Sequence, residues 1–143
     1  MYIDGSIQPV LTYNAHEGTA SASTKTVTYG SKYGTLATAT RNGYTFNGWY
    51  TAASGGTKVT ANTVTDHTGN KTIHAQWTAK TYTVTFNGNG GTPSSSSKTV
   101  TYDSTYGTLP TATRTGYTFN GWYTATSGGT KITSSTTVKI TAA

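Results

Sequence analysis

The chain has 143 residues, a formal charge of +6 and no cysteine, and it contains no apolar run long enough to cross a membrane. Hydrophobic residues make up 33% of it and charged residues only 10%, and the ten Lys and Arg residues form no run or stripe. These features exclude disulfides and thiolate metal sites, argue against nucleic-acid binding and membrane insertion, and favour a protein built mostly of β strands.

A tandem repeat divides the chain. When the sequence is shifted by 73 residues, Leu11–Asn14 falls on Val84–Asn87, and about 36 of the 50 positions from 11 to 60 are identical. Composition bias alone would not produce this self-similarity, so it indicates duplication. We therefore predict a leader of residues 1–8, a first repeat module of residues 9–79 and a second of residues 80–143. Each module is close to the lower size limit for a core of its own.

The first elements expected in each module are two strands joined by a flexible loop. In the second module Tyr82, Val84 and Phe86 alternate with threonines, which is the period of a half-buried strand. A glycine-rich and serine-rich loop, 87–97, separates this strand from a second one at 99–102. An irregular segment follows, in which Tyr106–Pro110 could form one short helical turn.

The next stretch carries the aromatic residues that we predict to form each core. It occurs almost unchanged at residues 41–59 and 114–132. An Asn-Gly pair inside it predicts a bulge or tight turn that places the tryptophan on the same side as the other two rings. The predicted structural core consists of Tyr44, Phe46, Trp49 and Trp77 in the first module and Tyr117, Phe119 and Trp122 in the second. Trp49 and Trp122 are expected to be equally buried.

A closing strand is expected at residues 71–77, with Ile73, Ala75 and Trp77 on its inner face. The second module contains no tryptophan that matches Trp77. Either Val138–Ile140 supplies its closing strand after loss of about six loop residues, or the module is truncated. A truncated module would borrow a strand from a neighbouring molecule or from the leader around residues 3 and 7, because an open apolar edge invites pairing.

Residues that could carry chemistry do not recur between the two copies. The three histidines, His16, His67 and His74, match other residue types in the second module, and so does Glu17. His67, His74 and Asp66 lack the spacing of metal ligands, so we expect no catalytic residue, metal or cofactor. The glycine-rich turn at 88–91 lacks the helix and lysine of a phosphate-binding loop. A covalent Lys–Asn crosslink through Lys98 and Asn87 would need an acid that the sequence does not place beside them.

Aromatic faces could instead contact sugars, as they do in many glycan-binding proteins. Most rings repeat with their spacing intact, which is what core packing requires. Four tyrosines are free enough to be candidates for glycan contact: Tyr33, Tyr50, Tyr106 and Tyr123.

The order of these motifs resembles the internalin B-repeat family, also called the Listeria-Bacteroides repeat. The most specific part of the resemblance is Gly-x-x-Phe-x-Gly-Trp-Tyr, present at residues 43–50 and 116–123. The resemblance implies two small β-grasp, ubiquitin-like modules with a minor helical part, of a kind that occurs in tandem on secreted or cell-surface bacterial proteins. It supplies no catalytic residue.

Together, these observations predict a non-enzymatic tandem repeat of a secreted or cell-surface bacterial protein. Its expected role is that of a stalk or spacer, with adhesion as a further role. The alternative is a carbohydrate-binding module that uses exposed tyrosines. Expected partners are host or cell-wall glycans or a host surface protein, and the two modules are expected to behave as monomeric beads joined near residues 79–80.

Overall fold

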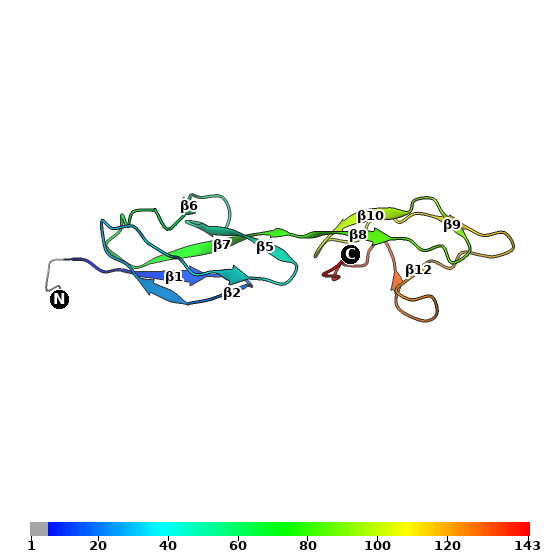
Figure 1. The fold of residues 1–143 in the computed structure, drawn as a ribbon, viewed down its shortest axis with the longest axis horizontal. Helices are drawn as coiled ribbons and strands as arrows, with labels where there is room; N and C mark the ends of the chain where they lie inside the picture. Colours follow the sequence, from blue (N-terminus) through cyan, green and yellow to red (C-terminus); the bar gives the residue numbers. More distant parts are fainter. Residues whose placement is uncertain (1–5) are drawn as a thin grey trace. The chain divides into compact units, whose positions relative to one another are not determined.

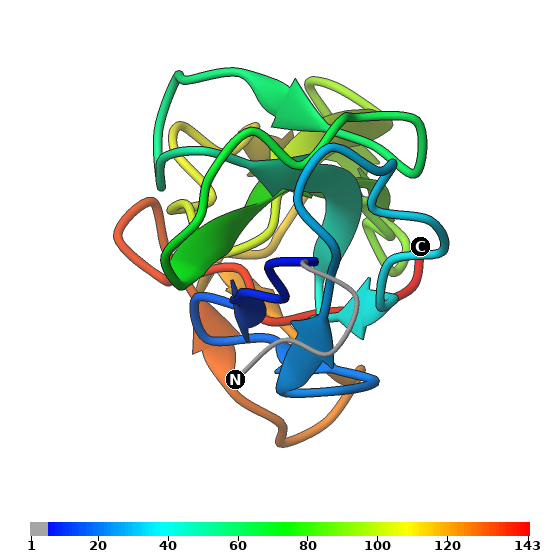
Figure 2. The same ribbon diagram turned by 90° about the vertical axis from the view of Figure 1, so that its left-hand side faces the viewer.

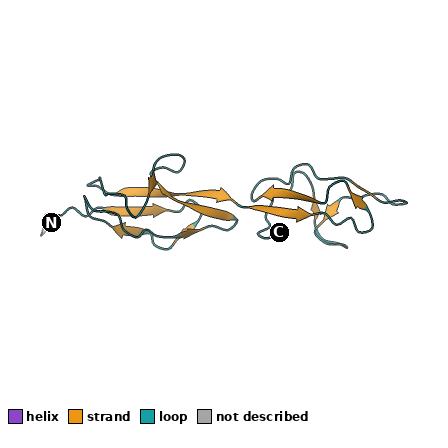
Figure 3. Cartoon of the chain, turned by 45° about the horizontal axis from the view of Figure 1, so that its top comes forward, coloured by secondary structure: helices purple, strands orange, loops and turns teal. Residues whose placement is uncertain are grey.

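The computed structural model describes residues 6–143 and divides into two compact units, unit 1 ending at Thr78 and unit 2 spanning Ala79–Ala143. Every regular element among the described residues is a β strand (Figures 1 and 3). The prediction of a mostly β protein is therefore confirmed. The expected helical turn at Tyr106–Pro110 is absent, because Gly107 adopts a positive φ of 69° that a right-handed helix does not allow. Residues 1–5 of the predicted leader lie outside the described residues.

Unit 1 is built around a mixed five-stranded sheet with the strand order β3-β1-β7-β5-β6. β2 and β4 pair with each other and form a separate two-stranded sheet. The strands are β1 (Val10–Asn14), β2 (Thr19–Ala20), β3 (Thr24–Thr26), β4 (Ala39–Thr40), β5 (Tyr44–Tyr50), β6 (Lys58–Val59) and β7 (Lys71–Ala79). In Figure 1 the green β7 runs between β1 and β5, and Figure 2 gives the view from the N-terminal end of this unit.

The central position of β7 follows from its alternating sequence. Ile73 and Ala75 are almost completely buried, and polar residues alternate with them. β7 pairs in parallel with β1, where Tyr13 lies opposite Ile73, and it is flanked by β5 on its other side. A strand between two neighbours exposes no edge, so the sheet of unit 1 is continuous across its centre.

Gly48 explains how two aromatic residues three positions apart reach the same core. It lies within β5 with a φ of 121°, a backbone conformation that residues other than glycine rarely adopt. This irregularity changes the strict alternation of the strand, so the rings of Phe46 and Trp49 meet edge to face with centroids 5.3 Å apart. Gly121 repeats the conformation in unit 2, with a φ of 122°.

Unit 2 contains the same local pairs but no continuous sheet. Its strands are β8 (Thr81–Thr85), β9 (Thr92–Pro93), β10 (Ser97–Thr101), β11 (Ala112–Thr113), β12 (Trp122–Tyr123) and β13 (Lys131–Ile132). They form three separate two-stranded sheets, β10-β8, β11-β9 and β12-β13. A small buried cluster of Val100, Tyr106 and Val138 holds the unit together.

The segment after β13 does not form the closing strand that the sequence suggested. Val138 is fully buried, but its amide donates to the Ser104 carbonyl at 2.7 Å, just as the amide of Thr65 donates to Ser31 at 2.8 Å in unit 1. Val138 is thus the counterpart of Thr65 at the same offset of 73 residues. No loop residues have been lost, and no described strand of unit 2 occupies the place of β7.

Candidate functional site

Three of the four predicted core aromatics of unit 1, Phe46, Trp49 and Trp77, form one cluster. Trp49 is 2% exposed, its ring lies 4.8 Å from that of Tyr13, and its indole N–H donates to the Ala37 carbonyl at 2.7 Å. Phe46 contacts both Trp49 and Trp77 and packs against the buried residues. Tyr44 is partly exposed and stacks instead with the guanidinium of Arg41, 3.7 Å from the ring centre.

The matching rings of unit 2 are arranged in the same way but are not covered. Trp122 lies 4.9 Å from Phe86 and 5.1 Å from Phe119, and it donates to the Pro110 carbonyl at 2.8 Å. Tyr117 is nevertheless 65% exposed and Phe119 44% exposed, and Trp122 is partly exposed. The expectation that these rings are core residues, with Trp122 buried as deeply as Trp49, therefore differs from the structure. The physical reason is that no described strand of unit 2 lies where β7 covers the equivalent rings of unit 1.

Two of the four tyrosines proposed for glycan contact are inside the protein. Tyr33 and Tyr106 are only 3% and 7% exposed, so neither ring can act as a platform for a sugar. The Tyr33 hydroxyl donates to Nε2 of His67, 2.7 Å away, because Nδ1 of His67 donates to the Gly69 carbonyl. Burial, with the nearby Asp66 carboxylate adding to it, raises the pKa of Tyr33. Tyr50 is partly exposed and Tyr123 is 44% exposed, so these two remain accessible.

Two of the three histidines of unit 1 form a pair. His16 and His74 stack with ring centres 4.9 Å apart, and Nε2 of His16 lies 2.7 Å from Nδ1 of His74, so that one nitrogen donates and the other accepts. Burial and the neighbouring His16 lower the pKa of His74. Within residues 6–143, no three His, Asp or Glu side chains gather closely enough to hold a metal ion.

A groove of about 600 Å³, with both polar and apolar residues in its lining, lies between β8 and β12 in unit 2. Val84 and Phe86 line one side, and Trp122 and Ile132 line the other. Leu109 and Ile140 add to its apolar lining, and threonines and asparagines contribute polar groups. The unit 1 counterparts of Val84, Phe86, Trp122 and Ile132 are Leu11, Tyr13, Trp49 and Val59, which are buried residues of the core cluster that also contains Ile73 and Ala75 of β7.

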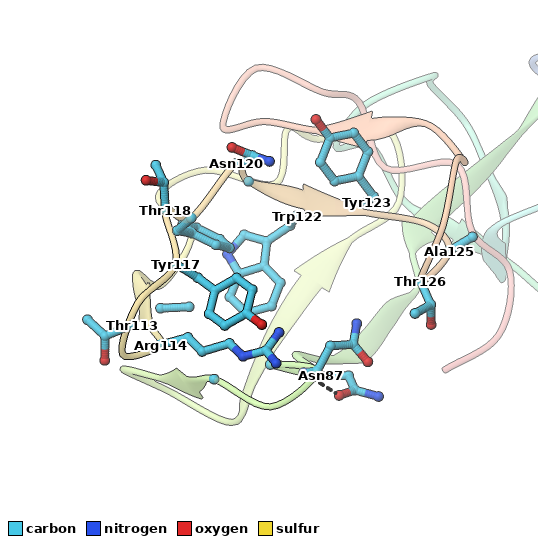
Figure 4. A pocket seen from close by; sticks show the side chains of 16 residues that line it. Asn87, Thr113, Arg114, Tyr117, Thr118, Asn120, Trp122, Tyr123, Ala125 and Thr126 are labelled. Carbon is cyan, nitrogen blue, oxygen red and sulfur yellow. Dashed lines mark hydrogen bonds between the residues drawn. The ribbon is translucent and has the colours of Figure 1, made fainter.

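A second hollow, of about 230 Å³, continues along the same side of unit 2 (Figure 4). Arg114 lies over the ring of Tyr117 at 3.7 Å, and Figure 4 shows both side chains beside Trp122 at its wall. Gly88, Gly91 and Phe119 also line it. In unit 1 the counterparts of these three, Ala15, Gly18 and Phe46, all contact the indole of Trp77.

The sequence contained a signal that would have located these two hollows. Thr60 and Thr63 form a turn in which the Thr60 amide donates to the Thr63 hydroxyl at 2.9 Å, and Thr133 and Thr136 form the same turn at the same distance. This Thr-x-x-Thr pattern repeats at the offset of 73 residues. It aligns the last residues of the chain with the loop that precedes β7 in unit 1, and not with β7 itself.

Comparison with known proteins agrees with the duplication. The model of the Listeria-Bacteroides repeat domain matches the chain twice, over residues 10–76 and 82–143. Internalin H of Listeria monocytogenes serovar 1/2a is 44% identical over 92 residues, which covers 64% of this chain and 16% of that protein. A protein of Evansella cellulosilytica named as a Gly-rich membrane protein is 34% identical over 100 residues, which covers 62% of this chain and 11% of that protein. The chain therefore corresponds to a small part of each of these relatives.

Proposed function

We propose, from the premise that the chain belongs to the Listeria-Bacteroides repeat family, that it serves as a non-enzymatic spacer in a bacterial surface protein. Internalin H and the Gly-rich membrane protein carry similar sequence within much longer chains. A module that recurs inside long chains suits a role in which it separates other parts of a protein. A location at the cell surface or outside the cell is part of this proposal.

The proposal rests on a comparison of the features that the two copies share with those that they do not share. The copies share their turns, the aromatic triplet and the backbone hydrogen bonds that hold the cluster around Tyr33 and Tyr106. They do not share the groups that could do chemistry: His16 and Glu17 of unit 1 are replaced by Asn89 and Gly90. Duplication of a scaffold without a repeated reactive group supports a mechanical role.

The finer fold assignment is also a proposal. We infer that unit 1 is a β-grasp module in which irregular chain takes the place of a helix. Its last strand, β7, lies beside its first strand, β1, and the two are parallel. That adjacency is the arrangement expected of the β-grasp fold.

The alternative function, carbohydrate binding, is supported by the accessible rings of Tyr50 and Tyr123. These occupy the same position in the two copies, so a tandem chain would present two equivalent platforms. The spacer role is preferred because the other two candidate rings, Tyr33 and Tyr106, are buried.

The spacer function should depend on the number of copies in tandem, whereas carbohydrate binding should depend on Tyr50 and Tyr123. The chain is placed between a cell-wall anchor and a reporter domain, once and then twice in tandem, and access of a bulky antibody to the reporter is measured. A spacer predicts that access rises with the number of copies and is unchanged by Tyr50→Ala with Tyr123→Ala. Specific binding on a glycan array that these two substitutions abolish would instead support the carbohydrate-binding function.

A further inference from the structure

Two histidines from distant parts of unit 1 lie side by side. His74 belongs to the central strand β7, and His16 follows β1, the strand that pairs in parallel with β7. Asn14 lies opposite His74 in that pairing, so the turn after Asn14 carries His16 to the same place. The two histidines are 58 positions apart in the chain, which is why their spacing in the sequence does not predict a site.

The position of His16 is set by a tight turn. The amide of His16 donates to the side-chain oxygen of Asn14 at 3.0 Å, and both His16 and Glu17 have positive φ angles, 47° and 71°. Residues other than glycine adopt such angles at an energetic cost, so the surrounding contacts must hold them there. Unit 2 keeps the turn with Asn89 in place of His16, at a φ of 48°. The turn is therefore shared scaffold, and the imidazole belongs to unit 1 alone.

The two ring nitrogens that face each other have the spacing of neighbouring ligands on one metal ion. Nε2 of His16 lies 2.7 Å from Nδ1 of His74. Two nitrogens bound at about 2.0 Å and at a right angle are about 2.8 Å apart, whereas a tetrahedral ion holds them about 3.3 Å apart. The observed spacing therefore matches neighbouring positions on a square-planar or tetragonal ion, the geometry that Cu²⁺ and Ni²⁺ prefer.

The protonation state of the pair also suits a metal ion. Burial, with a further contribution from His16, lowers the pKa of His74, so its imidazole is neutral at neutral pH. In the neutral pair a single proton lies between the two facing nitrogens. Each neutral imidazole carries its proton on either nitrogen, so this proton can move to the far nitrogen of its own ring. Both facing nitrogens then offer a lone pair, and binding needs no oxidation, reduction or net loss of a proton.

A cation can reach the pair from solvent. Both imidazoles are partly exposed, and His16 lines a hollow of about 360 Å³ that leaves room for water on the ion. Arg41 lines the same hollow, and its charge alone would oppose a second cation. The carboxylate of Glu17 lies 2.8 Å from the guanidinium of Arg41 and balances that charge. The hollow therefore presents two imidazoles without a net positive charge beside them.

We propose that His16 and His74 bind a divalent transition-metal ion through Nε2 and Nδ1 respectively, with Cu²⁺ held most tightly. Water fills the remaining positions, because no third His, Asp or Glu side chain among residues 6–143 gathers with the pair. The ion ties the turn after β1 to the central strand β7 and so strengthens unit 1. Unit 2, which contains no histidine, has no equivalent. This site goes beyond the spacer function and does not rest on it.

The test titrates the full chain with CuCl₂, NiCl₂ and ZnCl₂ in turn at neutral pH, and the heat of binding gives each affinity. We expect Cu²⁺ to bind about 10-fold or more tightly than Zn²⁺, in the order that nitrogen ligands impose. Cu²⁺ is paramagnetic, so in a ¹⁵N-labelled chain it should broaden the amide signals around His16 and His74 first and leave those of unit 2 sharp. The melting temperature of unit 1 alone should rise, because the ion binds the folded pair.

Matched variants test the two ligands. His16→Gln and His74→Gln should each weaken Cu²⁺ by about 10-fold or more, and the double variant should lose the site. His67→Gln is the control, because His67 is bonded elsewhere, to Tyr33 and to the carbonyl of Gly69. It should leave the affinity for Cu²⁺ unchanged. Mildly acid pH should weaken binding to the original chain, because protons compete for the two nitrogens.

Three results would overturn the proposal. The first is Cu²⁺ binding of equal strength in the double variant. The second is broadening that centres on His67 or on unit 2, and because this is measured on the unchanged chain it decides the matter even where a variant is less stable. The third is tighter binding of Zn²⁺ than of Cu²⁺, which would contradict the geometry assigned to the ion.

Discussion

Unit 1 and unit 2 contain the same aromatic triplet, the same turns and the same local hydrogen bonds, yet their rings differ in exposure. Trp49 is 2% exposed, whereas Phe119 and Tyr117 of the other copy are 44% and 65% exposed. The Phe and Trp rings of each triplet meet at nearly the same distance, 5.3 Å in unit 1 and 5.1 Å in unit 2, so local geometry is not the cause. The difference lies in β7, which covers the triplet of unit 1 and has no counterpart among the described strands of unit 2.

The comparison shows which parts of the module unit 2 shares with unit 1 although no described strand of unit 2 corresponds to β7. The turns and the cluster around Tyr106 rest on contacts within short stretches and on one long-range pairing with the segment that contains Val138. Phe119 and Trp122 keep the packing of their counterparts Phe46 and Trp49 as well. What the added strand contributes is burial, which makes up most of the stabilising free energy of so small a unit.

The largest expected effect comes from removing the central indole of each unit. Trp49→Ala should lower the free energy of unfolding of unit 1 by about 3–5 kcal/mol, because a fully buried indole is lost. Trp122→Ala should cost unit 2 less, since its indole is already partly in water. Denaturant unfolding followed by NMR signals assigned to each unit measures both values. Equal losses would show that the two tryptophans are equally buried in solution.

A matched exchange of Thr and Val should act in opposite directions in the two units. Thr65 is fully buried and its hydroxyl has no hydrogen-bond partner, whereas its counterpart Val138 has no polar atom to satisfy. Thr65→Val should stabilise unit 1 by about 1 kcal/mol, and Val138→Thr should destabilise unit 2 by about 1–2 kcal/mol. The control is Thr63→Val, which removes a hydroxyl that accepts from the Thr60 amide and should therefore destabilise unit 1. A loss of stability in Thr65→Val would contradict the assignment.

A smaller effect should appear as a pH dependence of unit 1 alone. The pKa of His74 is lowered from its ordinary value of 6.5 by burial and by His16, so the unfolded state binds a proton more readily than the folded state. Stability should therefore be complete above about pH 6.5 and should fall as the pH drops through that value. Thermal melting between neutral and mildly acid pH measures this loss.

Two controls separate the His74 effect from general acid sensitivity. His74→Gln should reduce the slope in unit 1, because it removes one member of the stacked pair with His16. Unit 2 contains no histidine and should melt at a constant temperature over the same range. An unchanged slope in the His74→Gln chain would rule out this residue as the source.

The smallest effect is expected at the surface. Arg41 pairs with Glu17 at 2.8 Å, but Glu17 is mostly exposed, and unit 2 has Gly90 in its place. Glu17→Gln should change the stability of unit 1 by no more than about 0.5 kcal/mol, and high salt should remove even that difference. Denaturant unfolding at low and high salt tests it. A loss above about 1 kcal/mol would show that the pair does more than bridge two surface side chains.

The sequence by itself determined the duplication, the mostly β character and the identity of the aromatic cluster. These are local properties. Alternation along residues 71–77 selects one face of a strand, an Asn-Gly pair selects a special backbone conformation, and Gly-Tyr-Thr-Phe-Asn-Gly-Trp-Tyr marks the family.

Only the tertiary structure decided which of these faces is covered. Periodicity shows that Tyr117 and Phe119 belong to one apolar face, but burial requires another element opposite that face, and no local pattern reveals whether it is there. Tyr33 and Tyr106 show the converse, because they look like surface residues in the sequence and are buried by segments about thirty residues away. The place of Val138 was decided in the same way, since a buried valine in a loop and one in a closing strand have the same local sequence. Burial requires contact between two surfaces, and the sequence of one segment does not show which other segment covers it.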